Sequence, residues 1–579
     1  MTASSSYTSP LNTMTALLKD VIGVTDLPHF KGGDLDADMI DVILQEAGRL
    51  AAEELAPLNH TGDGQGTVLR DGNVTTADGF KAFYDTYREN GWNAVPFTPE
   101  YGGQGLPWSL AFAVQEMWQA ANMSFGLCPM LNQGAVDALE AHGTEDQKAV
   151  YLEKMISGEW TGTMNLTEPQ AGSDLAQIKT KAEKQADGSY KITGQKIYIT
   201  YGEHDFTDNI IHFVLARTPD APAGVKGISL FLVPKFIPDE NGKPGLRNDL
   251  VCTGIEHKLG IHASPTCTMQ FGDQGGATGW LIGQENDGLK CMFTMMNNAR
   301  LSVGLQGVAL ADRAYQHALA YAQDRKQGTA IDDKDGARIS ISGHQDVKRM
   351  LLTMKALTEA GRAMAYHAAY YVDCVASGNN DGDDKARSYV DLLTPIVKSW
   401  CTDRAVDVAS LGVQVHGGMG FIEETGAAQY YRDARILPIY EGTNGIQALD
   451  LHGRKVLRDK GAVAFTYIED MRALAETLQQ DDDLEAAAVL FANAVAATDN
   501  ATRHLLTLDM KAGSAVNKAY LELFGYVVGA QMLLKTAQKT GDTDARKVAL
   551  FYVTNILPVA HSLAAIVENG ADSILDYTF

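Results

Sequence analysis

The spacing of apolar residues predicts helices at the start of the chain. Residues 36–55 and an apolar stretch after the loop PEYGGQGLP (99–107) are typical of helices, and a polar, glycine-bearing loop is expected at 60–72. In the first segment the apolar residues follow a period close to 3.6: Met39, Ile43, Leu44, Ala47 and Leu50. Residues 1–160 are therefore predicted to form a helical domain, with 1–35 as an extra N-terminal segment.

After residue 160 the pattern changes to that of strands. Residues 190–200 (YKITGQKIYIT) alternate between apolar and polar, and short apolar runs follow at 210–216, 228–233 and 268–271. Turn sequences such as DENGKPG separate these runs. The pattern predicts a small antiparallel β-domain over 161–284, inserted between helical regions.

Helical periodicity returns at about residue 285 and continues to the end. One helix is expected over 291–327, and residues 285–458 are predicted to form a second helical domain. Beyond it, four amphipathic segments predict an up-and-down bundle over 459–579: 462–478, 484–508, 514–539 and 543–568. The predicted fold is mainly α with an inserted β-domain and an extra C-terminal helical domain.

Composition excludes several classes of function. The chain has 579 residues and a formal charge of −24, which argues against a nucleic-acid-binding surface. Its six cysteines are scattered and form no C-x-x-C pair, so no zinc site or disulfide framework is predicted. We find no apolar run approaching ~20 residues and no leader sequence. A cytoplasmic protein without a membrane span is expected.

One carboxylate in RDARILPIYEGTNGIQ (432–447) is a candidate general base. Glu441 follows Pro438 in a short apolar loop, and Thr443 or Asn444 is placed to cap a helix that begins near Ile446. A carboxylate with few polar neighbours ahead of a helix suits proton abstraction. The spacing alone, however, favours an ordinary carboxylate at a helix N-terminus.

Other segments combine turn residues with possible phosphate contacts. NLTEPQAGSDL (165–175) is typical of a loop that begins a sheet. The glycine pair of SLGVQVHGGMGF (410–421) allows either close approach of backbone N–H groups to a diphosphate or tight helix packing. Arg325 suits a phosphate contact or a helix C-terminal cap. His262 is interpreted as a surface or hydrogen-bonded histidine without a role. No G-x-G-x-x-G follows a strand, so a Rossmann domain is not expected.

Taken together, NLTEPQAGSDL, KLGIHASPT (258–266), DRKQ (324–327), SLGVQVHGGMGF and RDARILPIYEGTNGIQ resemble, in order, the signature segments of the acyl-CoA dehydrogenases. The resemblance covers roughly residues 35–455. It implies an FAD enzyme that converts an acyl-CoA to the trans-2-enoyl-CoA. Glu441 would then remove the α-proton while the β-hydrogen leaves as hydride to flavin N5.

The resemblance also implies roles for other residues. Substrate contacts fall on Ser173, Arg300 and Gly442. Cofactor contacts fall on Leu166, Thr167, Ser173, Tyr198, Ile199, Thr200, Arg325, Gln327, Gln414, Gly417, Gly418 and Thr443. Five of these residues would meet the FAD of a neighbouring subunit: Arg325, Gln327, Gln414, Gly417 and Gly418. The resemblance therefore implies at least a homodimer. The chain departs from the family pattern in having Tyr198 for a tryptophan, Asn297 for an acid, and Gly328 with an insertion for a phenylalanine.

The C-terminal extension resembles that of a subgroup that includes the 3-(methylthio)propanoyl-CoA dehydrogenases and broad-range bacterial enzymes, where it would support dimerisation. The resemblance implies a short, sulfur-bearing acyl-CoA substrate and electron-transfer flavoprotein as electron acceptor, with no nucleic-acid or membrane partner. The alternatives are a medium- or long-chain acyl-CoA dehydrogenase, an acyl-CoA oxidase, and a non-catalytic flavin protein that binds DNA or scaffolds partners.

Overall fold

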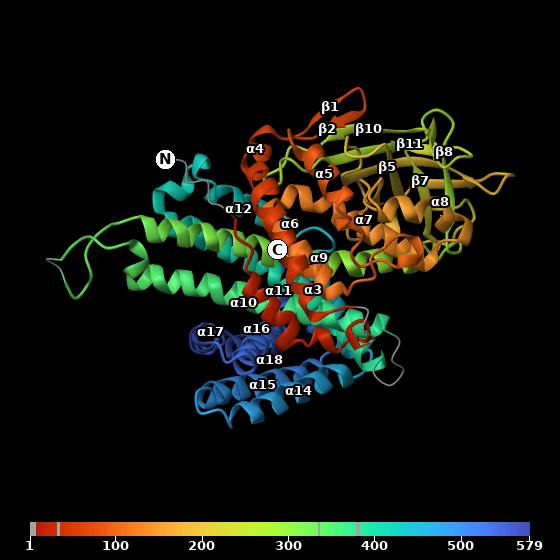
Figure 1. Ribbon diagram of the computed structural model, residues 1–579. Helices are drawn as coiled ribbons and strands as arrows, with labels where there is room; N and C mark the ends of the chain where they lie inside the picture. The colour runs from red at the N-terminus through yellow and green to blue at the C-terminus, as the bar shows by residue number, and fades with distance from the viewer. Residues whose placement is uncertain (1–6, 32–34, 334–335, 378–382) are drawn as a thin grey trace. The chain divides into compact units, whose positions relative to one another are not determined.

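The computed structural model describes residues 7–31, 35–333, 336–377 and 383–579 (Figure 1). The chain divides into two compact units. The sheet unit comprises residues 53–106 and 122–299, and the helical unit comprises residues 1–52, 107–121 and 300–579. The expected insertion of a β-domain between helical regions is confirmed.

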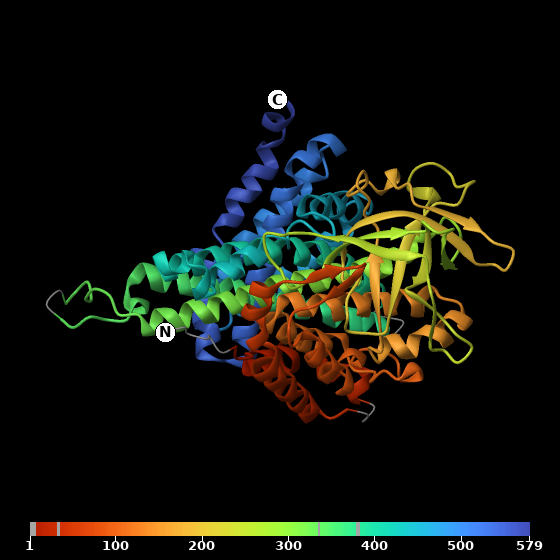
Figure 2. The same cartoon turned by 90° about the horizontal axis from the view of Figure 1, so that it is seen from above.

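An eight-stranded sheet forms the centre of the sheet unit (Figure 1, Figure 2). Its order is β10-β11-β5-β12-β7-β6-β3, with β4 beside β5. The strands are β3 (Trp160–Asn165), β4 (Lys181–Lys184), β5 (Tyr190–Thr200), β6 (Asn209–Ala216), β7 (Ser229–Pro234), β10 (Leu250–Ile255), β11 (Thr266–Phe271) and β12 (Ala277–Ile282). Every residue of β6 and β7 is buried, which explains their continuous apolar runs.

The expectation of a purely antiparallel domain is wrong in one place, because β3 and β6 are parallel neighbours. Parallel neighbours need a long crossover, and residues 166–208, which include β4 and β5, supply it. Strand β12 was also missed, since its sequence ATGWLI mixes small and apolar residues without alternation.

Four helices of the sheet unit precede the large sheet in the chain. They are α4 (Pro57–Gln65), α5 (Phe80–Glu89), α7 (Met123–His142) and α8 (Glu145–Ile156), and α7 and α8 pack against β3. Two hairpins complete the unit: β1 (Val68–Arg70) with β2 (Asn73–Thr75), and β8 (Phe236–Pro238) with β9 (Pro244–Arg247).

The predicted loop at 60–72 is a further error, because α4 and β1 occupy most of it. Pro57 begins the helix, where proline is well tolerated, and Gly66 follows its end with φ +67°. Gly62 suggested a loop in the sequence, but it serves packing. A Cβ at this position would lie 2.7 Å from the Phe80 ring.

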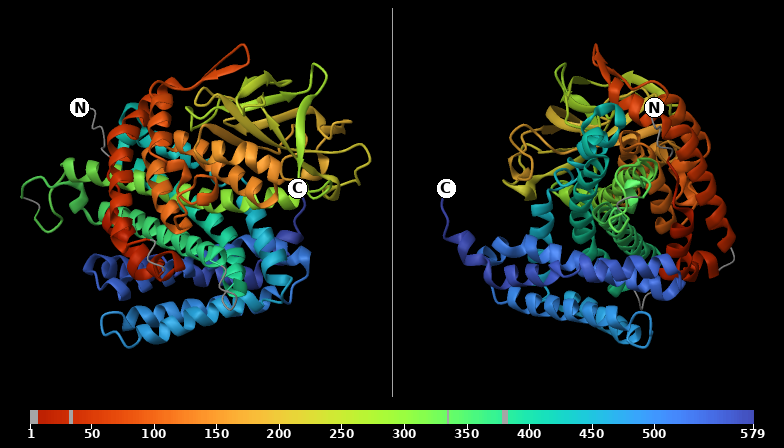
Figure 3. Two further views of the ribbon diagram at one scale, coloured as in Figure 1. Left: turned by 45° about the vertical axis from the view of Figure 1, so that its right-hand side comes forward. Right: turned by 90° about the vertical axis from the view of Figure 1, so that its left-hand side faces the viewer.

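Long helices dominate the helical unit (Figure 3): α9 (Gly288–Asp324, which begins in the sheet unit), α10 (Gln345–Ala376), α11 (Asp383–His416) and α16 (Met510–Thr540). The shorter ones are α1 (Leu11–Ala16), η1 (Leu17–Val21), η2 (Val24–Asp26), α2 (Pro28–Lys31), α3 (Ala37–Leu50), η3 (Ala51–Leu55, continuing into the sheet unit), α6 (Trp108–Ala121), η9 (Gly417–Phe421), α12 (Ala427–Ala434), α13 (Asn444–Asp450), η11 (Leu451–Leu457), α14 (Ala462–Leu478), α15 (Glu485–Leu505), α17 (Thr543–Asn555), α18 (Val559–Asn569) and α19 (Ala571–Leu575). Helix α6 is buried from Ser109 to Ala121 and lies in the core against α10.

The C-terminal helices pack on one another as the predicted bundle requires. Helices α14 and α15 lie side by side, and α18 packs against α15 and α16 (Figure 1, Figure 3). The helix predicted over 543–568 is instead two, α17 and α18. Proline at 558 has no N–H and disfavours helical geometry in the residue before it.

The same region corrects the expectation about apolar runs. Among the described residues, one stretch, 543–569, is long and apolar enough to cross a membrane by length and composition alone. Residues 548–565 lack Asp, Glu, Lys and Arg, although alanines and polar residues interrupt the run. Its buried side chains, including Tyr552 and Ala560, lie on the face that packs in the bundle.

Candidate active site

Glu441 lies in the turn between α12 and α13, with an uncommon backbone. Its φ is +54°, in the left-handed region that non-glycine residues rarely occupy, and Gly442 follows at φ +85°. A Cβ at Gly442 would lie 2.8 Å from Gln447 Nε2. Such strain costs of the order of 1–3 kcal/mol and is concentrated at functional sites. The backbone therefore marks Glu441 independently of its sequence motif.

Hydrogen bonds from α13 fix the turn. Thr443 is the N-cap, and its hydroxyl accepts from the Ile446 N–H at 3.2 Å. Helix α13 begins at Asn444, two residues earlier than expected. Buried Gln447 donates from Nε2 to the carbonyl oxygens of Glu441 (3.3 Å) and Gly442 (3.2 Å). The strained turn is thus tied to the helix that follows it.

Two cations influence the Glu441 carboxylate. Lys398 of α11 is buried and donates to Leu437 O (3.0 Å) and Asn444 Oδ1 (2.9 Å). Arg300 of α9 is also buried and lies 3.7 Å from Asp450 Oδ2. Burial raises the pKa of Glu441 to about 6, against the opposing effect of Lys398 and Arg300. Burial lowers the pKa of Lys398 to about 7. A carboxyl group with a pKa near 6 suits a general base at neutral pH.

A β-bulge shapes the candidate flavin residues of the sheet unit. The register between β5 and β11 shifts between Cys267 and Met269, and Tyr198 has φ +60°. The bulge leaves Tyr198 60% exposed, while its neighbour Ile199 is buried and Thr200 is half-buried. A large aromatic side chain is therefore presented at the end of a rigid strand.

Glu168 anchors the neighbouring segment 166–173 to β5. This buried carboxylate accepts hydrogen bonds from Lys196 Nζ (2.9 Å) and Thr180 Oγ1 (2.6 Å), among others. Burial alone would raise its pKa, but Lys196 and these hydrogen bonds bring it down to about 2. Lys196 also donates to Leu166 O at 2.9 Å, and the Thr167 carbonyl accepts from the Ile197 N–H at 2.9 Å. The segment is therefore held at the bulge, where Ile197 and Tyr198 lie opposite Thr268.

These residues fit a polar cofactor in their chemistry. Within the described ranges, the side-chain hydroxyls of Thr167, Ser173 and Thr200 make no hydrogen bond to another residue. Ser173 is exposed, and Thr167 is half-buried. These hydroxyl groups could hydrogen-bond the polar atoms of a flavin, and the exposed Tyr198 ring could pack against the flavin ring.

Apart from Thr443, the N-cap of α13, the other expected cofactor residues lie at or just beyond the C-terminal ends of α9 and α11. Gln414 is exposed, and a Cβ at Gly417 (φ +62°) or Gly418 would meet nothing within 4 Å. The glycine pair therefore does not serve tight helix packing. Arg325 and Gln327 are exposed just beyond α9, and in the described part of the chain the Arg325 guanidinium bonds no carbonyl of that helix. The anion-binding role of both segments stays a prediction.

The structure also identifies supporting residues that the sequence did not reveal: Glu168, Lys196, Lys398 and Gln447. Glu168 and Gln447 lie inside motifs, but the motifs do not show that these side chains are supports. Lys196 and Lys398 lie within a strand and a helix, with no local signal that distinguishes them from solvent-facing lysines. His262, to which no role was assigned, is a hydrogen-bonded histidine. Its ring lies 2.9 Å from Asp63 Oδ1 and 2.9 Å from Lys258 O.

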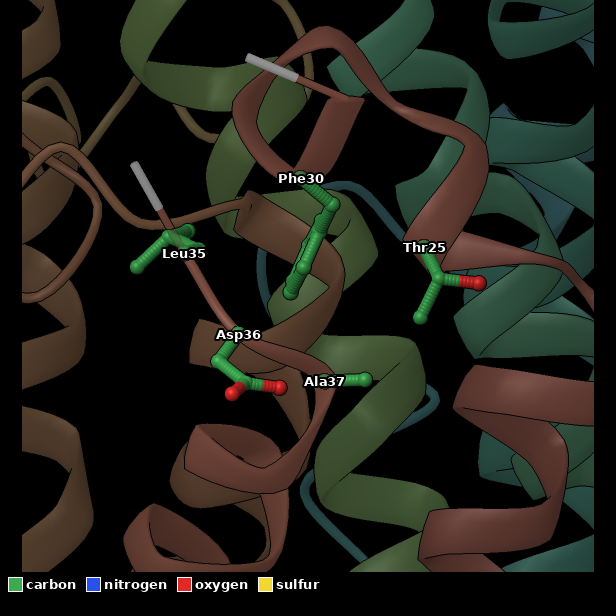
Figure 4. Close-up of a pocket in the computed structure, with 5 residues that line it drawn as sticks. All are labelled: Thr25, Phe30, Leu35, Asp36 and Ala37. Carbon is green, nitrogen blue, oxygen red and sulfur yellow. The ribbon is translucent and has the colours of Figure 1, made fainter. Parts of the chain in front are cut away.

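A surface pocket of about 420 Å³ lies elsewhere in the helical unit (Figure 4). It is lined by Thr25, Phe30, Leu35, Asp36 and Ala37. Asp36 caps α3 by accepting from the Asp38 N–H at 3.1 Å, so its carboxylate has a structural use. None of the predicted site residues lines this pocket. Within the described ranges, no group of three or more His, Cys, Asp or Glu residues is arranged to hold a metal ion.

Four family models match the chain in succession. They are the acyl-CoA dehydrogenase N-terminal domain (residues 40–159), middle domain (163–274) and C-terminal domain (286–456), and an acetyl-CoA dehydrogenase C-terminal-like domain (467–578). Together they account for well over half of the chain.

Relatives of known name agree with these matches. A 3-methylmercaptopropionyl-CoA dehydrogenase of Ruegeria pomeroyi is 51% identical over 84% of this chain and 82% of its own length. The broad-specificity linear acyl-CoA dehydrogenase FadE5 of Mycobacterium tuberculosis is 33% identical over 99% of both chains.

Solved structures share the fold at low sequence identity. ACDH-11 of Caenorhabditis elegans, in complex with C11-CoA, is 19% identical and matches with a TM-score of 0.78 over 99% of this chain and 96% of its own. An acyl-CoA dehydrogenase of Bacillus anthracis complexed with FAD is 21% identical, with a TM-score of 0.74 over 97% and 92%. Together with the family models and the curated relatives, these matches show that the chain belongs to the acyl-CoA dehydrogenase family and is an FAD-dependent oxidoreductase with an extra C-terminal helical domain.

Proposed function

We propose that the protein dehydrogenates 3-(methylthio)propanoyl-CoA, or another short acyl-CoA, to the trans-2-enoyl-CoA, with Glu441 as the base. The strained turn that holds half-buried Glu441 is the observation that carries the proposal. The 51% identity to the Ruegeria pomeroyi enzyme named for this acyl group supports the choice of substrate. Bound FAD supplies the hydride acceptor.

Glu441 would act through two groups. Its carboxylate takes the α-proton of the thioester, which is weakly acidic and needs stabilisation of the developing enolate charge. In the part of the chain that the structure describes, its backbone N–H donates to no other group. This N–H is therefore free to donate to the thioester oxygen. Arg300 and Gly442 are proposed substrate contacts in the helical unit, and Ser173 is proposed separately in the sheet unit.

Cofactor contacts are proposed separately for each unit. In the sheet unit they are Leu166, Thr167, Ser173, Tyr198, Ile199 and Thr200, supported by the bulge and the unused hydroxyls. In the helical unit they are Arg325, Gln327, Gln414, Gly417, Gly418 and Thr443. The exposed arginine and the open glycine backbone suit the diphosphate of an FAD bound to a second subunit, so we propose a homodimer. We also propose electron-transfer flavoprotein as the electron acceptor, as the family resemblance implies. The four proposed domains are 1–160, 161–284, 285–458 and 459–579, and each matched range lies within one of them.

An anaerobic titration tests the proposal. Butanoyl-, octanoyl-, palmitoyl- and 3-(methylthio)propanoyl-CoA are added separately to the purified holoenzyme while the flavin absorbance is followed. We expect 3-(methylthio)propanoyl-CoA to bleach the flavin at the lowest concentration, and slow reoxidation when air is readmitted. Bleaching by palmitoyl-CoA alone would contradict the assignment of a short acyl-CoA as the substrate. Rapid reoxidation of the flavin by air would indicate an oxidase. No bleaching by any acyl-CoA would reject the proposal.

A further inference from the structure

The Glu441 turn is fastened to α11 by Asn444. The Asn444 side chain is 5% exposed, and its Nδ2 donates to Asp403 Oδ1 (2.8 Å), Thr402 Oγ1 (3.0 Å) and Ser399 O (3.1 Å). The backbone N–H of Asn444 donates to the Pro438 carbonyl oxygen at 3.0 Å, across the turn. The orientation of this one amide therefore helps to set the path of the turn that carries Glu441.

The second oxygen of Asp403 faces the C-terminal domain. Lys518 of α16 lies with Nζ 2.7 Å from Asp403 Oδ2 and 3.3 Å from Ser399 Oγ, and it also pairs with Glu522. Glu522 accepts from Arg404 Nη1 at 2.9 Å. Lys518 and Arg404 thus pair with Asp403 and Glu522 at the junction of α11 and α16, and Arg404 also pairs with Asp407, so Lys518 is the cation that bridges Asp403 and Glu522.

Close backbone packing fixes the position of α16 at this junction. A Cβ at Gly513 would lie 2.2 Å from the ring of His452, in η11 directly after α13. A Cβ at Gly525 would lie 2.4 Å from Trp400 of α11. Helix α16 therefore approaches α11 and η11 as closely as glycine allows, one approach on each side of Lys518. This packing is independent of the charges and places Lys518 in register with Asp403.

We propose that Lys518 is a positioning residue for the Glu441 turn, acting through Asp403 and Asn444. The C-terminal domain would then form part of the scaffold of the active site, in addition to any role in dimerisation. The expected effect of Lys518 on catalysis rests on the proposed function of Glu441. The expected effect of Lys518 on the order of the turn does not.

Removal of the Lys518 charge would loosen the turn more than the fold. A partly exposed ion pair contributes little to global stability, and the Lys518 side chain is 41% exposed. Asp403 and Glu522, however, are 23% and 13% exposed and would be left as neighbouring carboxylates. Their repulsion would turn Asp403 away from Asn444. The strained backbone at Glu441 would then lose the support that over-determines it.

Hydrogen–deuterium exchange of the holoenzyme tests the coupling without any need for activity. In Lys518→Met we expect the segment 435–447 to exchange about tenfold faster, as for a loop that opens locally. Lys518→Arg should restore near-wild-type exchange. Exposed Lys511 on the same helix provides the matched control, Lys511→Met. Exchange in Lys518→Met equal to that in the control, or faster exchange spread equally to residues 190–200, would overturn the inference.

Flavin reduction supplies the second readout. We expect the rate constant for reduction by the bleaching acyl-CoA to fall about tenfold in Lys518→Met, with an unchanged dissociation constant for acyl-CoA and with recovery in Lys518→Arg. A looser turn with an unchanged rate constant would contradict the positioning role. If wild-type flavin is bleached by no acyl-CoA, the proposed function fails, and the exchange experiment still tests the coupling.

Discussion

The Lys398 ammonium lies 2.9 Å from Asn444 Oδ1, three residues beyond Glu441. The same ammonium donates to Leu437 O at 3.0 Å, on the other side of the turn. Lys398 therefore joins the two ends of the segment that carries the proposed base. Its positive charge also lowers the pKa of Glu441, which burial raises to about 6. One buried side chain both shapes the turn and adjusts the basicity of its carboxylate.

Replacing Lys398 with methionine should shift the pH dependence of flavin reduction. A base acts in its ionised form, so the rate constant rises with pH through the pKa of Glu441. Without the cation that pKa increases, and the rise moves to higher pH. Stopped-flow reduction at pH 5 to 9 measures the shift, with Lys511→Met as control. A profile that stays in place or moves to lower pH would contradict the assignment.

Glu168→Gln should remove an acid-dependent part of the stability. The folded pKa of Glu168 is about 2, below its ordinary value of 4.5, so the ionised group stabilises the fold above pH 4.5 and this contribution is lost as the pH falls toward 2. Melting curves from pH 2 to 7 should show a weaker pH dependence in the variant over this range. Glu183→Gln, on an exposed position of β4, should behave like wild type.

A buried charge cluster makes Arg362 important for stability. Its Nε donates to Glu116 Oε1 at 2.8 Å, and its Nη2 lies 3.0 Å from Asp312 Oδ1. Arg362→Met would leave two buried carboxylates without their cation, at a cost of roughly 3–5 kcal/mol in the free energy of unfolding. Arg349 on the same helix pairs with Asp346 at the surface, so Arg349→Met should cost less than about 1 kcal/mol. Urea denaturation compares the two, and equal losses would be inconsistent with the buried cluster.

Gly513→Ala should disturb the packing of α16 on η11. The added methyl group would lie 2.2 Å from the buried His452 ring, and overpacking of this kind costs typically 1–3 kcal/mol. At Gly453 a Cβ has only one neighbour, Met510 Cε at 3.7 Å, so Gly453→Ala is the matched control. The unfolding free energies of both variants, measured in urea, check the prediction. Equal stability of the two would show that His452 moves aside at no cost.

The parts of the fold that the sequence predicted well are those with a strict period. Strand β5 and helix α14 have the predicted bounds, 190–200 and 462–478. The helical spacing is unbroken in α14, and β5 continues through the bulge at Tyr198. Helix α4 was missed because Gly62 has a packing role that only the tertiary structure reveals. The separation of α17 from α18 follows from a proline that the helical pattern obscured.

For the site, motifs located Glu441 and the flavin segments but not their supports. The sequence indicates Thr443 as one of two possible caps, and the structure confirms it, since a hydroxyl before a helix is a local signal. Lys398, Asp403 and Lys518 lie within long helices, where a charged residue usually faces solvent. Their roles arise from packing between helices distant in sequence. The positive φ of Glu441 likewise depends on Gln447 and Asn444, which no local pattern connects to it.

Flavin bleaching by the Glu441→Gln variant tests the central claim most directly. The amide keeps the size of the side chain and cannot accept the α-proton, so FAD binding and folding should match wild type. We expect no bleaching of this variant under anaerobic conditions by any acyl-CoA that bleaches the wild-type flavin. Bleaching of the variant at a rate close to that of wild type would show that another group is the base, and would contradict the account.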